Sequence, residues 1–235
     1  MEQNTLKVTS VLADPTRFSI YQYVAKQHRE VTVQEVAEVF DIHVNVARLH
    51  LTKLESVSLL ASETKKTGKG GRPSRCYYIS DQGVHIQFPF RDYHRLAVLA
   101  MESLASFGEE GQLALNRLGH SFGKEAVLSY LKDTNTIGES LDLSEKMNVV
   151  EMVAAQQGLN PELSYDAEEK VIHFQIYNCP FKELLPSHSG SLCNMHHALM
   201  KGMFEGVFQD VSFTEQSLMD GSRNSSCSYT AVQLS

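Results

Sequence analysis

The spacing of apolar residues along the first sixty positions predicts three short helices. Asp14 before Pro15 is a helix-start signal, and the helix that follows is expected to reach about residue 25. Thr32 and Glu35 form a capping box, which predicts a second helix, and helical spacing resumes after residue 43. The expected buried residues of the three helices are Phe18, Tyr21, Val24 and Ala25; Val33, Val36, Ala37 and either Val39 or Phe40; and Val46, Ala47, His50, Leu51 and Leu54.

The tight connection over residues 40–43 joins the second and third helices as in a helix-turn-helix motif. In that motif the second helix of the pair enters the major groove of DNA. The residues of this helix that fall outside its apolar stripe are therefore the candidates for DNA contact. They are Val44, Asn45, Arg48, Thr52 and Lys53.

A strand-like run after Leu60 and another over residues 75–79 flank a glycine-rich segment, which predicts a β-hairpin, or wing. Glycines allow a close approach of the backbone to phosphates, and basic side chains add a salt-dependent attraction. Lys69, Arg72 and Arg75 are the candidate phosphate contacts of this wing.

The charge distribution supports a DNA partner for the N-terminal part only. Residues 1–91 carry 12 Lys and Arg against 9 Asp and Glu, a net charge of +3, whereas the whole chain has a net charge of −7. The remainder is strongly acidic, which fits a part that is kept away from phosphate.

The middle of the chain, residues 89–135, has long helical patterns. Its apolar positions serve equally well to pack against a second copy or to cap the domain that follows. A winged helix reads one half-site, so a homodimer on a palindromic operator is the expectation. The apolar positions are Tyr93, Leu96, Leu99, Ala100, Leu104, Phe107, Leu113, Leu115, Leu118, Phe122 and Val127.

The last part of the chain alternates predicted helices and strands. The helices are expected at residues 145–157 and 193–208, and the strands are expected at 162–165, 171–177, 211–215 and 227–232. The fold class is therefore α+β. The expected organisation is a winged helix-turn-helix domain at 1–88, a helical dimerisation segment at 89–140 and an α+β sensor domain at 141–235.

No run of apolar residues is long enough to cross a bilayer and no signal peptide opens the chain, so a cytoplasmic location without a membrane partner is expected. In that compartment the cysteines stay reduced, and three of them, Cys179, Cys193 and Cys227, fall in the predicted sensor domain. Cys193 is expected at a helix start, where the helix dipole stabilises a thiolate. Thiolates select zinc, copper(I) or an iron–sulfur cluster, but spacing alone does not choose among these or exclude ordinary buried cysteines.

The N-terminal part resembles winged-helix repressors of the ArsR/DeoR type, and above all the SufR-type regulators that sense iron–sulfur clusters. The resemblance is carried by residues 48–55, by Leu59, by the run 70–74 with Tyr78, and by Gly83 and Phe88-Pro89. Ser58 departs from the pattern because such sequences usually have glycine there, which puts the turn geometry in question.

The C-terminal part resembles the cluster-binding domain of the same regulators, on the run Ile176–Phe181 followed by Cys193 and Cys227. The resemblance implies that the three cysteines hold a cluster, a 4Fe-4S cluster being expected, and that the loaded dimer represses. Residues 194–226 contain no further cysteine, so a fourth ligand must be another residue or come from outside the protein. The candidates in the chain are His196, His197, Asn178 and Glu183.

No motif of a common enzyme class occurs, so catalysis is not expected. Three alternatives stay open at this point. The regulator could sense zinc or thiol oxidation through the same cysteines, or it could sense an organic ligand. More distantly, the chain could be a thiol-dependent enzyme with an appended DNA-binding domain. Cys76, on a wing strand without a partner in sequence, is interpreted as structural.

Overall fold

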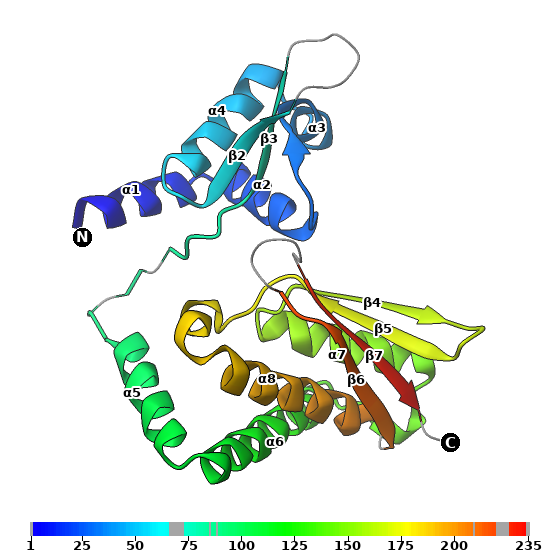
Figure 1. The fold of residues 1–235 in the computed structure, drawn as a ribbon. Helices are drawn as coiled ribbons and strands as arrows, with labels where there is room; N and C mark the ends of the chain where they lie inside the picture. The colour runs from blue at the N-terminus through cyan, green and yellow to red at the C-terminus, as the bar shows by residue number, and fades with distance from the viewer. Residues whose placement is uncertain are drawn as a thin grey trace. The chain divides into compact units, whose positions relative to one another are not determined.

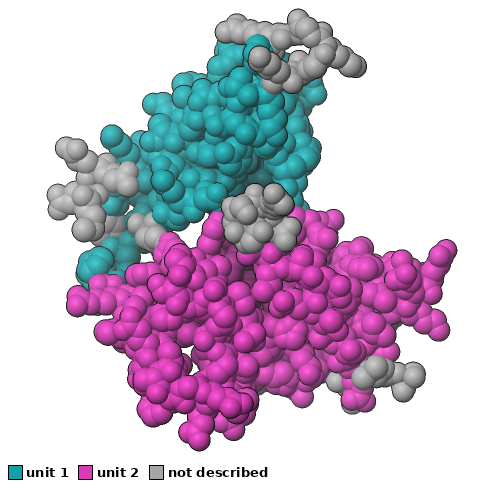
Figure 2. Space-filling model, viewed as in Figure 1, with its two compact units in different colours: residues 1–91 teal, residues 92–235 magenta. Residues whose placement is uncertain are grey.

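The fold is described from a computed structural model, which places residues 2–65, 73–84, 86–87, 89–208, 210–219 and 226–233. The chain divides into two compact units, Met1–Arg91 and Asp92–Ser235 (Figures 1 and 2). Each unit has its own hydrophobic core. The long helices that follow Arg91 belong to the second unit.

The first unit is a winged helix-turn-helix. Its helices are α1 (Glu2–Leu12), α2 (Pro15–Lys26), α3 (Val33–Val39) and α4 (Val44–Glu55), and its strands are β1 (Val31–Thr32), β2 (Leu60–Lys65) and β3 (Ser74–Ile79). The strands form one antiparallel sheet in the order β1-β3-β2, with β2 and β3 as the wing hairpin. The side chain of Asp14 caps α2 and that of Thr32 caps α3, as the sequence predicts.

The buried residues of this unit differ from the predicted ones at several positions. In α2 the buried residues are Ile20 and Val24, and Phe18 is 42% exposed. In α4 Val46 is exposed, while the other four predicted residues are buried. At the end of α3 Phe40, and not Val39, packs on the core. Helix α1, which the apolar pattern did not predict, adds Val8 and Val11.

Ser58 lies in the turn between α4 and β2 and has a φ of 59°. This left-handed conformation is one that glycine adopts without steric cost. The turn thus has a backbone conformation that suits glycine, with a serine in its place.

The second unit has the predicted α+β composition. Its elements in chain order are α5 (Tyr93–Ser106), α6 (Glu109–Asp133), η1 (Gly138–Ser140), α7 (Leu143–Gln156), β4 (Pro161–Asp166), β5 (Val171–Ile176), η2 (Lys182–Leu184), α8 (Leu185–Phe208), β6 (Val211–Ser217) and β7 (Cys227–Gln233). The strands form an antiparallel sheet in the order β4-β5-β7-β6 (Figure 1). Helices α6, α7 and α8 share one core with the inner face of this sheet.

Helices α6 and α8 approach each other closely through glycines. A Cβ atom at Gly123 would collide with the carbonyl of Leu199, and one at Gly202 would collide with the carbonyl of His120. At Gly119 a Cβ would lie 2.7 Å from the carbonyl oxygen of Met195. The two backbones are therefore in direct contact at the crossing. Beside it, the imidazole of His120 makes a hydrogen bond of 2.7 Å with the carboxylate of Glu205.

The glycine face of α6 leaves most of its large apolar residues outside the core, so of the two uses expected for these positions they do not serve to cap the second unit. The buried positions of α6 are Gly111, Gly119, Gly123, Val127 and Leu131. Leu113, Leu118 and Phe122 are exposed instead, because the glycine stripe occupies the side that faces α8. Neither α6 nor any other helix in the described part of the chain is long and apolar enough to span a membrane.

Replacement of Gly123 by alanine is expected to destabilise the second unit by about 1–3 kcal/mol, because the backbones must separate to admit the methyl group. Gly190→Ala is the matched control, since Gly190 lies in α8, the helix that Gly123 of α6 faces, and nothing lies within 4 Å of the place that its methyl group would take. That control should be neutral or slightly stabilising. Urea unfolding followed by circular dichroism measures both variants, and equal stability of the two would contradict the close crossing.

Candidate functional site

The exposed surface of α4 carries most of the residues predicted to contact DNA. Asn45, Arg48, Thr52 and Lys53 are all exposed on this helix. Val44 is half-buried and packs against the core of the unit, so it offers the least surface of the five.

Two features of α4 prepare this face for base edges. The guanidinium of Arg48 donates a hydrogen bond of 2.9 Å to the side-chain oxygen of Asn45, which orients both side chains outward from one turn of the helix. Val46 and Leu49 are exposed beside them. An arginine suits guanine, an asparagine suits adenine, and apolar side chains suit the methyl group of thymine. The helix therefore presents the donor, acceptor and apolar groups of direct readout.

The described basic residues of the wing are paired with carboxylates. The guanidinium of Arg75 donates to both carboxylate oxygens of Glu55 at 2.7 Å, and the ammonium of Lys65 lies 2.5 Å from the carboxylate of Glu30. Lys69 and Arg72 lie outside the described residues. The sequence analysis did not identify Glu55 as a partner of Arg75. Its position at the end of α4 and the alternation of side chains along the wing strands could have indicated this pairing.

The three C-terminal cysteines come together at one end of the second unit. Cys227 is the first residue of β7 and pairs with Ile176, the last residue of β5. Cys179 follows three residues after that strand end. Cys193 lies on α8, and the thiols are close enough for the charge on one to affect the titration of another.

Burial and mutual repulsion hold these thiols in the neutral form. Burial raises the pKa of Cys179, and negative charge on Cys227 and Cys193 raises it further. Burial raises the pKa of Cys193 and that of Cys227 as well, although the backbone N–H of Met219, 3.2 Å from the Cys227 sulfur, lowers the latter. A positively charged group bound here would reverse this balance, because it favours the thiolate.

The position of Cys193 corrects the expectation that it opens a helix. Helix α8 begins at Leu185 and is kinked at His188, so Cys193 lies more than one turn inside it. The helix dipole acts mainly within the first turn. It therefore gives no account of a thiolate at Cys193, and burial dominates the titration of this residue.

The described residues form no ready-made site for a single metal ion. No group of three or more His, Cys, Asp or Glu side chains in the described part of the chain is arranged to hold one.

The structure distinguishes the two histidines that follow Cys193. His196 is 5% exposed, its Nε2 has no hydrogen-bond partner, and burial lowers its pKa to about 4. Its ring meets the edge of Phe181, two residues after Cys179, at 5.3 Å between centroids. His197 is half-buried instead, with its ring against those of Phe213 and Tyr229.

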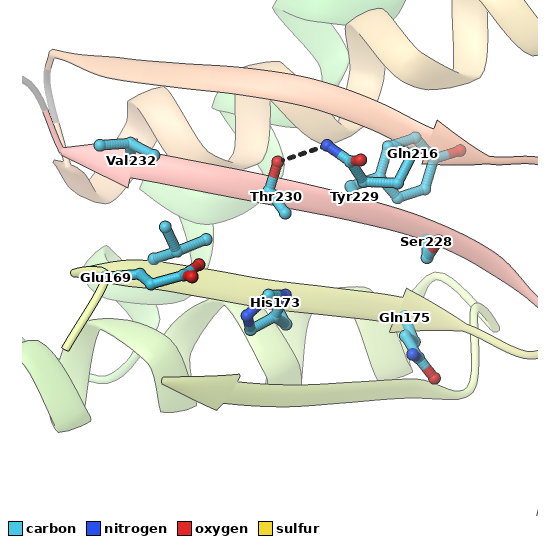
Figure 3. Close-up of a pocket in the computed structure, with 9 residues that line it drawn as sticks. Glu169, His173, Gln175, Gln216, Ser228, Tyr229, Thr230 and Val232 are labelled. Carbon is cyan, nitrogen blue, oxygen red and sulfur yellow. Dashed lines mark hydrogen bonds between the residues drawn. The ribbon is translucent and has the colours of Figure 1, made fainter. Parts of the chain in front are cut away.

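The outer face of the second sheet carries an open hollow of about 540 Å³, along β5 and β7 (Figure 3). His173, Gln175 and Thr230 line it, and Gln216 donates a hydrogen bond of 2.9 Å to the hydroxyl of Thr230. Pockets for organic ligands are mostly apolar and enclose their ligand. Val171, Tyr229 and Val232 also line the hollow, but it is open and does not enclose a ligand.

Comparison with known proteins bears on the first unit. Residues 12–63 match the family of helix-turn-helix domains, so the chain carries an N-terminal helix-turn-helix domain. No curated protein matches the chain. Among solved structures there is a likeness to trafficking protein particle complex subunit 3 from Naegleria fowleri, covalently bound to palmitic acid, with 12% identity and a TM-score of 0.43. It covers 61% of this chain and 91% of that chain, and at this level it carries no argument about fold or function.

Alkylation of the native protein by iodoacetamide at pH 7.5 is expected to be much slower at Cys179 and Cys227 than in the unfolded chain, because both thiols are buried and their pKa values are raised. A raised thiol pKa stabilises the fold below the unfolded pKa of about 8.5, and that stability is lost as pH rises through the folded pKa. Mass spectrometry of labelled peptides measures the rates. Equal alkylation rates in native and unfolded protein would contradict the burial of these two thiols.

Proposed function

We propose that this protein is a transcription regulator that binds operator DNA through its first unit and senses an iron–sulfur cluster through its second. The DNA-binding part rests on one observation above all. A helix-turn-helix family match falls on a unit in which α4 exposes Asn45, Arg48, Thr52 and Lys53 and a hairpin follows.

The proposal includes a homodimer that reads a palindromic operator. A single α4 reads one half-site, and two copies related by a twofold axis read both halves. The large apolar residues that the glycine stripe leaves outside the core supply a surface for the second copy. Those exposed on α5, on α6 and at the residue that follows α5 are Tyr93, Leu96, Leu99, Phe107, Leu113, Leu118, Phe122 and Leu128.

The donor set at the cysteine site is one that an iron–sulfur cluster takes. Three thiols that form no disulfide meet at one end of the sheet, those of Cys179 and Cys227 buried and that of Cys193 half-buried. Thiolates also bind zinc, so the choice of a cluster rests on the family resemblance. When bound, such a group supplies redox-dependent stability to the site. The resemblance to SufR-type regulators points to the same group.

Among the candidates for a fourth ligand, His196 is favoured over His197. It lies one helical turn after Cys193, and its neutral ring keeps an unpartnered Nε2 near the loop that carries Cys179. A buried nitrogen without a partner is costly unless something binds it. The ring of His197 is already packed among aromatic side chains.

Coupling between the units follows from linkage. A group that binds one arrangement of the dimer better than another shifts the population toward that arrangement. By the family resemblance, the protein that holds the cluster represses, and loss of the cluster releases the operator. Zinc binding, or a disulfide between two of the same cysteines, is the alternative that shares these residues.

Arg48→Ala is expected to weaken binding to a duplex selected by the wild-type protein by about 1–3 kcal/mol, and to weaken binding to random duplexes far less, because it removes a base contact. The selected duplex is expected to be palindromic. Lys132→Ala, an equal loss of charge on the exposed end of α6, serves as the control. Fluorescence anisotropy at several salt concentrations measures both, and equal losses on selected and random DNA would show that α4 does not read bases.

Serine in place of Cys179, Cys193 or Cys227 is expected to abolish iron and sulfide binding in anaerobic reconstitution, because each removes a soft ligand. His196→Leu should lower the iron content and change the visible absorption, whereas the matched His197→Leu and Cys76→Ser should not. Operator affinity should differ between loaded and unloaded wild type by a factor of about 5–150. Zinc without sulfide would support the alternative, and equal affinity for all forms would contradict sensing.

A further inference from the structure

We propose that Arg75 is a positioning residue that fixes the wing hairpin, β2 and β3, against the end of α4, and that its guanidinium does not contact a DNA phosphate. The proposal goes beyond the proposed function and needs only its DNA-binding part. It concerns how helix and wing are held in one geometry, and it is independent of any group bound at the cysteines.

A closed set of hydrogen bonds joins three elements at the base of the wing. Glu55, the last residue of α4, accepts from Arg75 of β3 with both carboxylate oxygens at 2.7 Å. The hydroxyl of Ser62, on β2, donates to Glu55 at 2.6 Å and accepts from the Nε of Arg75 at 2.8 Å. Each of the three side chains therefore contacts the other two.

The surroundings of Arg75 fix its guanidinium further. The group lies 5.4 Å from the centre of the Tyr77 ring, which is fully buried in the core of the unit. Ser62 pairs with Tyr77 across the strands, so the hydroxyl and the guanidinium are diagonal neighbours on the hairpin. Exposed ion pairs usually contribute little. Here, however, Nη2 of Arg75 donates to both carboxylate oxygens of Glu55 while Nε donates to Ser62, so that two nitrogens of the guanidinium are held at once.

A phosphate at Arg75 would have to compete with this network. It would displace the Glu55 carboxylate, which accepts two hydrogen bonds from Arg75, and it would leave the negative charge of Glu55 close to the phosphate. Like charges at such a distance repel. In its place beside Glu55 the guanidinium instead fixes the angle of β2 and β3 to α4.

The test compares Glu55→Gln, Arg75→Gln and the double variant of the full chain, on a duplex selected by the wild-type protein. Positioning predicts that each single variant binds about 5–30 times more weakly and that the double variant is no weaker than either single one, since the same network is lost once. The slope of log K against log salt should stay as in wild type, because no phosphate contact disappears.

A phosphate contact predicts the opposite pattern. Glu55→Gln would then bind at least as tightly as wild type, because it removes a competing anion, and Arg75→Gln would flatten the salt slope by about 0.9. Either result overturns the proposal. Arg75→Lys, which keeps the charge without the fork, should bind as weakly as Arg75→Gln if the residue positions the wing, and close to wild type if it contacts phosphate.

Two further measurements keep the outcomes distinct. Circular dichroism melting shows whether each variant folds, and the exchanged pair Glu55→Arg with Arg75→Glu should recover part of the affinity that Arg75→Glu alone loses. Failure of the exchanged pair to recover any affinity in a folded protein would count against positioning. A wild-type protein that selects no duplex at all would instead overturn the DNA-binding function itself.

Discussion

The second unit depends on the contact between the backbones of α6 and α8. Glycines on both helices remove the side chains that would hold them apart, so the carbonyls of Leu199 and His120 lie where methyl groups would otherwise be. Large side chains displaced from this crossing face outward on α6, while the other faces of α8 pack on the sheet and carry Cys193 and His196. One close approach thus determines both the apolar outer surface and the placement of two candidate ligands.

Local signals in the sequence predicted the first unit well. Caps at Asp14 and Thr32, the short connection before α4 and the two strands of the wing all depend on neighbouring residues, and the structure has each of them. The predicted buried residues were wrong where a helix has apolar residues on more than one face. Phe18 and Ile20 both fit a helical stripe, and only the packing of α2 against the rest of the unit decides that Ile20 is inside.

The residues of the candidate sites could be named from the sequence, but their geometry could not be predicted. A family resemblance singled out three cysteines, whereas their meeting depends on the pairing of Ile176 with Cys227, which joins residues far apart in the chain. The sequence pattern placed Cys193 at the start of a helix, because the kink at His188 hides the true start. Likewise, a basic residue such as Arg75 is interpreted as surface charge until the carboxylate beside it is known.

The glycine crossing also limits how the length of the chain can vary during evolution. A single residue inserted before Gly119 would turn the rest of α6 by about 100° relative to its beginning, and would bring Leu118 or its neighbours against the backbone of α8. An insertion in the connection after Asp133 leaves the crossing untouched. We therefore expect homologues to keep the interval from Gly111 to Leu131 constant and to place their insertions and deletions in the loops on either side.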